Sequence, residues 1–378
     1  MLIKKREQQI LKVGVLLPNS RQYPGAAGYF LNGMRLYFTV HENQFERGKA
    51  ELLIEEVGVA TESICIEKAH KLLSTDQAII LTGLIEPLIG VEVAKMTCMA
   101  GCPTMLSTLG EAAVPPDKIT KNLYYNTLQY WQSYFYLGRY MAENTTKEFE
   151  IITSFYDCGY DPLRAFRMGI ISAGGQIRNE IILKTENLEE LNGEVKERIQ
   201  FHDEYEYALI LHPKLLNWFI KNFDGGLKNA VITPFSNYAN GNKKFWAFPD
   251  WKNSSPNSTI FQRSCLEYFD EEANEFYLLG YQQGQLIYRA LQSLNDPARD
   301  EQTILDTWSN FREDMVVAGA SFDQGNHHLN FPLSIFYGAG MKDENLCIKE
   351  SHHHFRPADG YEDIFNSRNA FTNPYMFY

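Results

Sequence analysis

The sequence has few basic residues and no long apolar run. Among its 378 residues, Lys and Arg number 35 against 47 Asp and Glu, so the net charge is −12. Such a chain has no general attraction to phosphate backbones or anionic lipid, which argues against nucleic-acid binding. The longest apolar stretch, 78–91, is interrupted by Glu86 and Pro87 and is shorter than the roughly 18 residues that cross a bilayer. We therefore expect no direct membrane insertion.

Cysteine is also scarce, and no export signal precedes the first predicted strand. The cysteines are scattered rather than spaced as a disulfide framework, although the spacing leaves room for one bridge. We interpret them as buried free thiols: Cys65, Cys98, Cys102, Cys158, Cys265 and Cys347. The basic N-terminus, MLIKKREQQ, lacks the apolar segment of a signal peptide. The chain is therefore expected in the cytoplasm if Met1 is the native start, and outside it if an export signal was removed.

Motifs of enzymatic chemistry are missing from the sequence. Neither GxGxxG after a strand, GxxxxGK[ST], HExxH nor GxSxG occurs. Two histidine clusters, His327-His328 and 352–354, consist of adjacent residues, which point to opposite faces of a strand and form no preorganised set of metal ligands. We interpret both clusters as solvated loops. The sequence therefore predicts no enzyme, no cofactor and no metal site.

Strands and helices alternate along most of the chain, in two successive series. The first series has strands at 11–17, 51–56, 78–82 and 104–106 and helices at 26–42, 61–73 and 87–100. After Val114-Pro115-Pro116 the second has strands at 123–125, 149–155, 176–183, 207–211 and 230–233 and helices at 129–144, 162–173, 188–200 and 213–223. Two such series predict an α/β fold of two doubly wound, Rossmann-like lobes.

The last third departs from this alternation. A segment rich in Asn, Ser and Gly, 237–258, is expected to be a loop around a short strand at 245–248. Helices are expected at 272–294 and 301–311, followed by a β-hairpin of 316–322 and 329–337 and a tail.

In an open α/β sheet, ligands lie outside the carboxyl ends of the strands. This rule selects seven loops of the predicted fold: 19–23, 84–87, 107–111, 127–131, 156–161, 212–214 and 234–238. Most aromatic residues of the helix at 129–144 are expected to pack in the core, but Tyr130 and Trp131 stand at its start, next to these loops.

Five segments resemble one protein family, in its order and over nearly the whole chain. They are KVGVLLPNSRQYPGAAGYFLNGMRLY, AIILTGLIEPLIGVEVAKMTCMAGCPTMLS, ITSFYDCGYDPLRAFRMGIISAGGQI, FYLLGYQQGQLIYRALQSL and GASFDQGNHHLNFPLSIF. They are similar to segments of the type I periplasmic binding proteins, in the branch typified by the leucine/isoleucine/valine-binding protein. Each motif is loose by itself, and the combination is more specific.

The resemblance implies two lobes joined by three hinge crossings, which we expect near Asn126, Trp251 and Gly319. One lobe would then comprise 1–126 and 251–319, and the other 127–250 and 320–378. A small ligand would bind between them, and closure would signal to an ABC-type permease or another protein partner. The resemblance also implies a periplasmic location for an exported form.

The sequence departs from the family at the ligand loops. The places that hold an amino acid's carboxylate in the family fall on Glu86-Pro87 and on Thr108, Leu109 and Gly110, while the place of the family's acidic residue for the ammonium group falls on 234–237, which has no acid. A carboxylate at Glu86 would repel another in a cleft of low dielectric. Glu86 would favour a cationic or hydrogen-bond-donating group, or else it interacts only with the dipole of its helix.

We therefore expect a small-solute-binding receptor whose ligand is not a standard free α-amino acid, with Tyr23, Trp131 and Tyr160 as stacking surfaces. Two alternatives stay open: a cytoplasmic small-molecule sensor, and a degenerate clamp that acts as a protein-interaction scaffold. The candidate ligand-binding residues are Asn19, Ser20, Tyr23, Glu86, Thr108, Leu109, Gly110, Trp131, Tyr160, His212 and Ser236.

Overall fold

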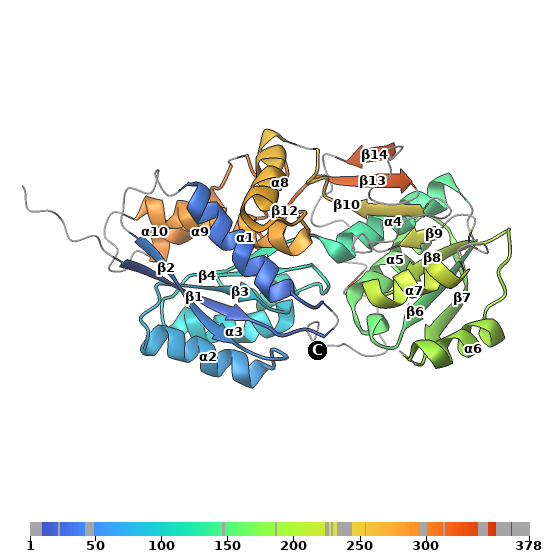
Figure 1. Ribbon diagram of the computed structural model, residues 1–378, viewed down its shortest axis with the longest axis horizontal. Helices are drawn as coiled ribbons and strands as arrows, with labels where there is room; N and C mark the ends of the chain where they lie inside the picture. Colours follow the sequence, from blue (N-terminus) through green and yellow to red (C-terminus); the bar gives the residue numbers. More distant parts are fainter. Residues whose placement is uncertain are drawn as a thin grey trace, which may run out of the picture.

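The computed structural model consists of two α/β lobes that lie side by side (Figure 1). It describes residues 10–21, 23–41, 49–145, 148–185, 187–223, 227, 230–232, 244–253, 255–294, 301–312, 314–338, 347–352 and 364. Among these residues, no helix has the length and apolar character needed to cross a membrane.

The first lobe is built on a parallel sheet with the strand order β2-β1-β3-β4-β5. Its strands are β1 (Ile10–Leu17), β2 (Lys49–Glu56), β3 (Ile80–Leu84), β4 (Thr104–Thr108) and β5 (Leu123–Thr127). The strands β3 and β4 and the edge strand β5 are buried at every position, as is typical of parallel strands covered on both faces.

Helices cover both faces of this sheet (Figure 1). They are α1 (Ala26–Val40), α2 (Glu62–Ser74), α3 (Pro87–Met99), α8 (Pro256–Phe269), α9 (Glu275–Ser293) and α10 (Glu301–Ser309). Two glycines allow α1 and α9 to pack closely. An added Cβ would lie 2.3 Å from the Tyr277 oxygen at Gly33 and 1.9 Å from the Phe30 oxygen at Gly280.

The second lobe is a mixed sheet with the order β7-β6-β8-β9-β10-β13-β14. Strands β6 to β10 pair in parallel, and β13 and β14 add two antiparallel strands at one edge. The strands are β6 (Glu148–Ser154), β7 (Gln176–Leu183), β8 (Glu206–Ile210), β9 (Ala230–Ile232), β10 (Lys244–Phe248), β13 (Leu333–Gly338) and β14 (Cys347–His352).

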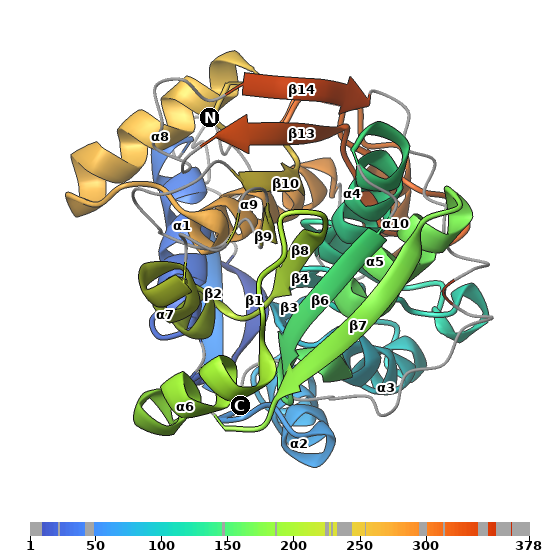
Figure 2. The same ribbon diagram turned by 90° about the vertical axis from the view of Figure 1, so that its right-hand side faces the viewer.

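Helices cover both faces of this second sheet (Figure 2). They are α4 (Tyr130–Asn144) and α5 (Asp161–Ser172) on one face, and α6 (Leu188–Arg198) and α7 (Pro213–Phe223) on the other. On the first face Phe166 packs with Phe149 and Ile151 of β6, and on the second Phe219 packs with Tyr207 and Leu209 of β8. Successive residues of a strand point to opposite faces of the sheet, so β6 and β8 contribute to a separate apolar layer on each face.

The chain passes between the lobes three times. It crosses at Leu128 and Gln129 after β5, in the segment 249–255 that contains Trp251, and again before β13. The third crossing comes later than the expected position near Gly319. The short strands β11 (Ser321–Phe322) and β12 (Leu329–Asn330) stay with the first lobe, because the Tyr125 N–H donates to the His327 oxygen at 3.0 Å and His328 forms a β-bridge with Tyr125. We therefore assign 320–330 to the first lobe and the crossing to 331–332.

Four further expectations for the last third were wrong in whole or in part. Helix α8 occupies part of the predicted loop, where the Ser255 hydroxyl caps the helix and Pro256 takes its first position. The predicted hairpin forms only in part: β11 pairs antiparallel with β12, but after Pro332 the chain continues into β13, which joins the other sheet. His328 is buried rather than solvated, and the predicted tail contains β14.

The cysteines are free where the structure describes their side chains. Cys65, Cys102, Cys158 and Cys265 are buried, as predicted, whereas Cys98 is half-buried. The side chain of Cys347 lies outside the described residues.

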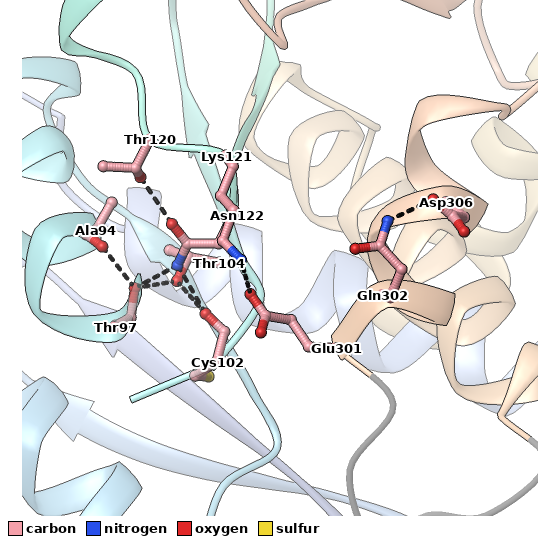
Figure 3. A network of polar contacts seen from close by, with 10 residues as sticks. All are labelled: Ala94, Thr97, Cys102, Thr104, Thr120, Lys121, Asn122, Glu301, Gln302 and Asp306. Atoms are coloured by element: carbon pink, nitrogen blue, oxygen red, sulfur yellow. Dashed lines mark hydrogen bonds and ion pairs between the residues drawn. The ribbon is translucent and has the colours of Figure 1, made fainter. Parts of the chain in front are cut away.

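A buried polar network fastens the amino ends of β4 and β5 to the end of α3 (Figure 3). The Asn122 amide donates to the Thr97 hydroxyl at 3.0 Å and to the Cys102 carbonyl oxygen at 2.8 Å. The hydroxyls of Thr97 and Thr104 lie 2.6 Å apart, and the Thr120 hydroxyl donates to the Asn122 side-chain oxygen at 2.7 Å. This network holds the edge of the sheet opposite to the predicted ligand loops.

Candidate functional site

The loops at the carboxyl ends of the strands meet between the lobes. Asp161, at the start of α5, donates its backbone N–H to the Glu111 carbonyl oxygen at 3.0 Å, and its carboxylate accepts the Ala113 N–H at 2.6 Å. Glu111 and Ala113 belong to the loop after β4 in the first lobe, so these contacts join the two lobes directly. Nine predicted site residues lie in the loops of this region, and all nine are buried: Ser20, Tyr23, Glu86, Thr108, Leu109, Gly110, Trp131, Tyr160 and His212.

Glu86 is fully buried at the N-terminus of α3. One carboxylate oxygen, Oε2, accepts the Ile89 N–H at 2.9 Å and so caps the helix, as one of the two interpretations expects. The other oxygen, Oε1, has no hydrogen-bond partner in the described structure. Burial raises the pKa of Glu86 well above its usual value, and the nearby carboxylate of Glu111 raises it further.

Glu111 is the second buried acid of the first lobe, and it has a similar arrangement. Its Oε2 accepts the hydroxyl proton of Thr108 at 2.6 Å, while Oε1 has no hydrogen-bond partner among the described residues. Burial raises the pKa of Glu111 to about 7, although the hydrogen bond from Thr108 opposes the shift. The sequence marked the loop 107–111 but did not distinguish Glu111 from its neighbours.

Two tyrosines, one from each lobe, are influenced by the charge of this acid. Tyr23 of the first lobe and Tyr160 of the second both lie within electrostatic range of Glu111, and burial raises the pKa of each. The ring of Tyr156 lies 5.3 Å from that of Tyr160, in an edge-to-face arrangement. Tyr23 packs at 5.6 Å against Phe276 of α9, which fixes its ring from the side of the first lobe.

His212 follows β8 in the second lobe and is also buried. Its backbone N–H donates to Asp157 Oδ2 at 3.0 Å, and Asp157 also accepts the hydroxyl proton of Ser154 at 2.6 Å. Neither ring nitrogen of His212 has a hydrogen-bond partner in the described structure. Burial lowers the pKa of His212 to about 4, so the imidazole is neutral at pH 7 and retains one donor and one acceptor.

The loop 108–110 forms part of the first crossing. The Tyr130 N–H donates to the Leu109 oxygen at 3.0 Å, and the Trp131 N–H donates to the Gly110 oxygen at 2.9 Å. Gly110 has φ +85°, and an added Cβ would lie 2.6 Å from the Thr127 hydroxyl. Only glycine fits this turn, which brings the start of α4 against the acid-bearing loop.

A separate shallow hollow lies at the second crossing. It is lined by Trp246, Phe248, Pro249, Asp250, Trp251, Lys252, Asn253 and Phe336. No predicted site residue lines this hollow, and the ammonium group of Lys252 lies over the ring of Trp251 at 5.2 Å from its centroid.

The comparisons with known proteins give structural matches alone. No protein-family model and no curated protein matches the sequence. A solute-binding protein of an ABC transporter from Rhodopseudomonas palustris BisB5, in complex with 3,4-dihydroxybenzoic acid, superposes with a TM-score of 0.77 and 16% identity, over 93% of this chain and 99% of that one. The leucine-binding protein LivK of Thermotoga maritima gives 0.69 and 12%, over 92% and 99%.

A third match is the branched-chain amino acid substrate-binding protein LivJ of Streptococcus pneumoniae, in complex with isoleucine. Its TM-score is 0.70 and its identity 14%, over 90% of this chain and 99% of that one. The chain has the fold of the type I periplasmic binding proteins. This confirms the fold class that the strand–helix alternation and the resemblance predict.

The other two predicted site residues are not part of this buried group among the described residues. Asn19 is exposed, and its backbone N–H donates to the Gly58 oxygen at 2.6 Å. Ser236 lies outside the described residues. Ser20 has a local role, because its hydroxyl oxygen accepts the Tyr23 N–H at 2.9 Å and shapes the turn that presents Tyr23.

Sequence reasoning missed several residues of the loops that meet between the lobes. Asp157, Asp161 and Tyr156 lie in a loop that the carboxyl-end rule selected, but only Tyr160 was chosen from it. The number of acidic residues could have identified them, since the loops selected by the carboxyl-end rule contain four: Glu86, Glu111, Asp157 and Asp161. Arg164, near these acids, is paired with Asp161 at 2.7 Å.

Proposed function

We propose that this chain is the solute-binding component of an ABC-type importer, and that its two lobes close around a small ligand. It would be a binding protein and not an enzyme, would act in the periplasm, and would deliver the ligand to a membrane permease. The observation that carries the proposal is the set of buried polar groups between the lobes whose bonding capacity is unused: the Oε1 atoms of Glu86 and Glu111 and both ring nitrogens of His212. Buried polar atoms without partners are costly, and a ligand would satisfy them.

The same groups argue against a standard free α-amino acid as the ligand. Its carboxylate could lie beside Glu86 and Glu111 only if both acids stayed protonated, because like charges repel strongly where side chains are shielded from water. The matched aromatic-acid and amino-acid binders therefore support the fold and the location of the site, but not the chemistry of the ligand.

The scaffold alternative is less well supported than a working receptor. A clamp that no longer binds a solute would be free to fill the space between its lobes with apolar side chains, which removes the cost of buried polar atoms. Here four acidic residues and His212 are buried in the loops of this region.

A solute screen followed by small-angle scattering tests the proposal. Benzoates, branched-chain amino acids, amides and amines are added at millimolar concentration while the melting temperature is recorded. A ligand at 100 times its dissociation constant adds about 2.7 kcal/mol to the free energy of unfolding. We expect at least one solute to raise the melting temperature and to reduce the radius of gyration, through tighter closure of the lobes.

Two tyrosine variants supply the specificity control. Tyr160→Ala should abolish the shift, while Tyr268→Ala, which removes an exposed tyrosine of α8, should retain it. A screen in which no solute changes either quantity would favour the scaffold alternative instead.

A further inference from the structure

Glu86 and Glu111 each use one carboxylate oxygen and leave the other free. Glu86 Oε2 binds the N-terminus of α3, and Glu111 Oε2 binds the Thr108 hydroxyl, so neither side chain can turn away without losing a bond. Both residues are at most 1% exposed, and the remaining oxygen of each has no partner among the described residues. The carboxylate of Glu111 is near enough to Glu86 to raise the pKa of that acid.

No basic side chain compensates this pair in the described structure. The guanidinium of Arg164 is paired with Asp161, and no cation is among the groups that influence Glu86 or Glu111. Two buried carboxylates without a counter-charge are unfavourable, and each acid's raised pKa reflects this. A cation from outside would remove the cost.

The surrounding side chains suit an organic cation better than a metal ion. Tyr23 and Tyr160 lie near Glu111 from opposite lobes, and tyrosine faces attract ammonium groups. No His, Cys, Asp or Glu joins the pair to form a metal-binding group within the described ranges. Two free acceptor oxygens require N–H donors, which a primary ammonium has and a quaternary ammonium lacks.

We propose that the cleft binds its solute through a protonated primary amine, held by the free oxygens of Glu86 and Glu111 and covered by Tyr23 and Tyr160. This inference rests on the proposed receptor function and names its ligand class, an organic amine with no carboxylate next to the ammonium group. His212, at the second lobe, supplies a neutral donor and acceptor for the remainder of the ligand.

Pairs of small molecules that differ in one group test the charge preference. 3-Methylbutylamine is leucine without its carboxylate, 2-phenylethylamine is phenylalanine without its carboxylate, and benzylamine replaces the carboxylate of benzoate with an aminomethyl group. Calorimetric titration of the full chain at pH 8 should give at least tenfold tighter binding for the amine in one or more pairs. The N,N,N-trimethyl derivative of that amine should bind at least tenfold more weakly.

Isosteric variants then locate the ammonium group. Glu86→Gln keeps the helix cap and Glu111→Gln keeps the acceptor for Thr108, so both should fold, and each should weaken amine binding by 10- to 100-fold. Glu92→Gln is the matched control, because Glu92 lies on the exposed side of the same helix and pairs with Lys95. Its affinity should equal that of the wild-type protein.

Three results would overturn the inference. In the first, benzoate or leucine binds and the lobes close in the scattering measurement, but none of the amines binds. This result would contradict the ligand class and still support the receptor function. The second is equal amine affinity in the wild-type protein and both Gln variants, which would move the site elsewhere. In the third, no solute binds and the radius of gyration does not change, and the proposed function then fails as well.

Discussion

Asp161 and Glu111 lie on different lobes, and the backbone N–H of Asp161 donates to the Glu111 carbonyl oxygen at 3.0 Å. A second hydrogen bond also joins the two lobes, because the Asp161 carboxylate accepts the Ala113 N–H at 2.6 Å. The backbone of Glu111, a buried acid of the first lobe, is thus held directly to the second lobe. Closure of the lobes and the placement of Glu111 are therefore coupled.

Asp161→Ala should shift the lobes toward an open arrangement. The variant loses the bond to Ala113 and leaves the half-buried Arg164 without its partner. A charge-assisted hydrogen bond contributes about 1.5–3 kcal/mol, so affinity for a solute found in the screen should fall by roughly 10- to 100-fold. Titration and small-angle scattering measure the two effects.

Asp161→Asn keeps an acceptor oxygen for the Ala113 N–H and should lose less affinity than Asp161→Ala. Glu143→Ala, which breaks an exposed ion pair with Arg139 on α4, is the control and should bind as the wild type does. Wild-type affinity in Asp161→Ala would show that this contact contributes nothing to closure.

Glu111 should make the ligand-free protein less stable at alkaline pH. Its pKa is about 7 in the folded state against 4.5 ordinarily, so the folded protein holds a proton that the unfolded chain has already lost between these values. Stability therefore falls as pH rises from 4.5 to 7, by up to about 3 kcal/mol. Glu111→Gln should be more stable than the wild type at pH 8 and similar to it at pH 4.5.

Urea unfolding at pH 4.5 and pH 8 measures this difference. Glu92→Gln, on the exposed side of α3, should show no comparable gain at pH 8. If Glu111→Gln were equally destabilised at both pH values, the burial of a charge at this position would not be what limits stability. A gain in stability together with a loss of amine binding would identify Glu111 as a residue kept for function at a cost in folding.

Local patterns were sufficient to predict most of the first lobe. The apolar run of β1 and the Pro87 start of α3 are visible in the sequence, and both elements form where expected. Helix α8 was missed because its polar sequence, PNSTIFQRSCLEYF, follows an Asn- and Ser-rich segment, although Ser255-Pro256 is a helix-start signal. Pro332 likewise marked the break between β12 and β13.

The site was harder to predict than the fold, since its contacts join residues distant in sequence. The bond from Ala113 to Asp161 spans 48 positions and forms only when the lobes meet. Glu86 was identifiable from its place before Pro87, whereas Glu111 becomes distinctive only through its complete burial and its free oxygen. Sequence rules identify the loops at the ends of the strands. Which side chains of these loops are buried with free polar atoms depends on the tertiary structure.

His212 should make the folded protein sensitive to acid. The pKa of His212 is about 4 in the folded state and 6.5 ordinarily. Between these two values the unfolded chain binds a proton at this residue and the folded protein does not. Stability therefore falls as pH drops from 6.5 to 4, by up to about 3 kcal/mol. His212→Gln cannot titrate and should lose less stability over this range, as chemical denaturation at pH 7 and pH 4.5 would record.

His328 provides an independent comparison for this effect. It is buried beside Tyr125, and burial lowers its pKa to about 3, so His328→Gln should reduce the acid loss similarly. The two variants should differ in function, because only His212 lies among the ligand loops. An unchanged acid profile in both variants would contradict the assigned cause.

Asn122→Ala should destabilise the protein without changing solute affinity. Asn122 donates to Thr97 and Cys102 and accepts from Thr120, so its loss removes three hydrogen bonds from this network (Figure 3). Each hydrogen bond contributes about 0.5–1.5 kcal/mol, and we expect a loss of about 2 kcal/mol or more in the free energy of unfolding. The network lies at the amino ends of β4 and β5, whereas Glu86 and Glu111 follow the carboxyl ends of β3 and β4. Urea unfolding should therefore report the loss of stability, while the calorimetric affinity stays at the wild-type value.

Asn144→Ala, which removes an exposed amide at the end of α4, should alter neither quantity. A drop in affinity for Asn122→Ala would mean that strain at one edge of the sheet reaches the other, and that the two ends of these strands do not act independently.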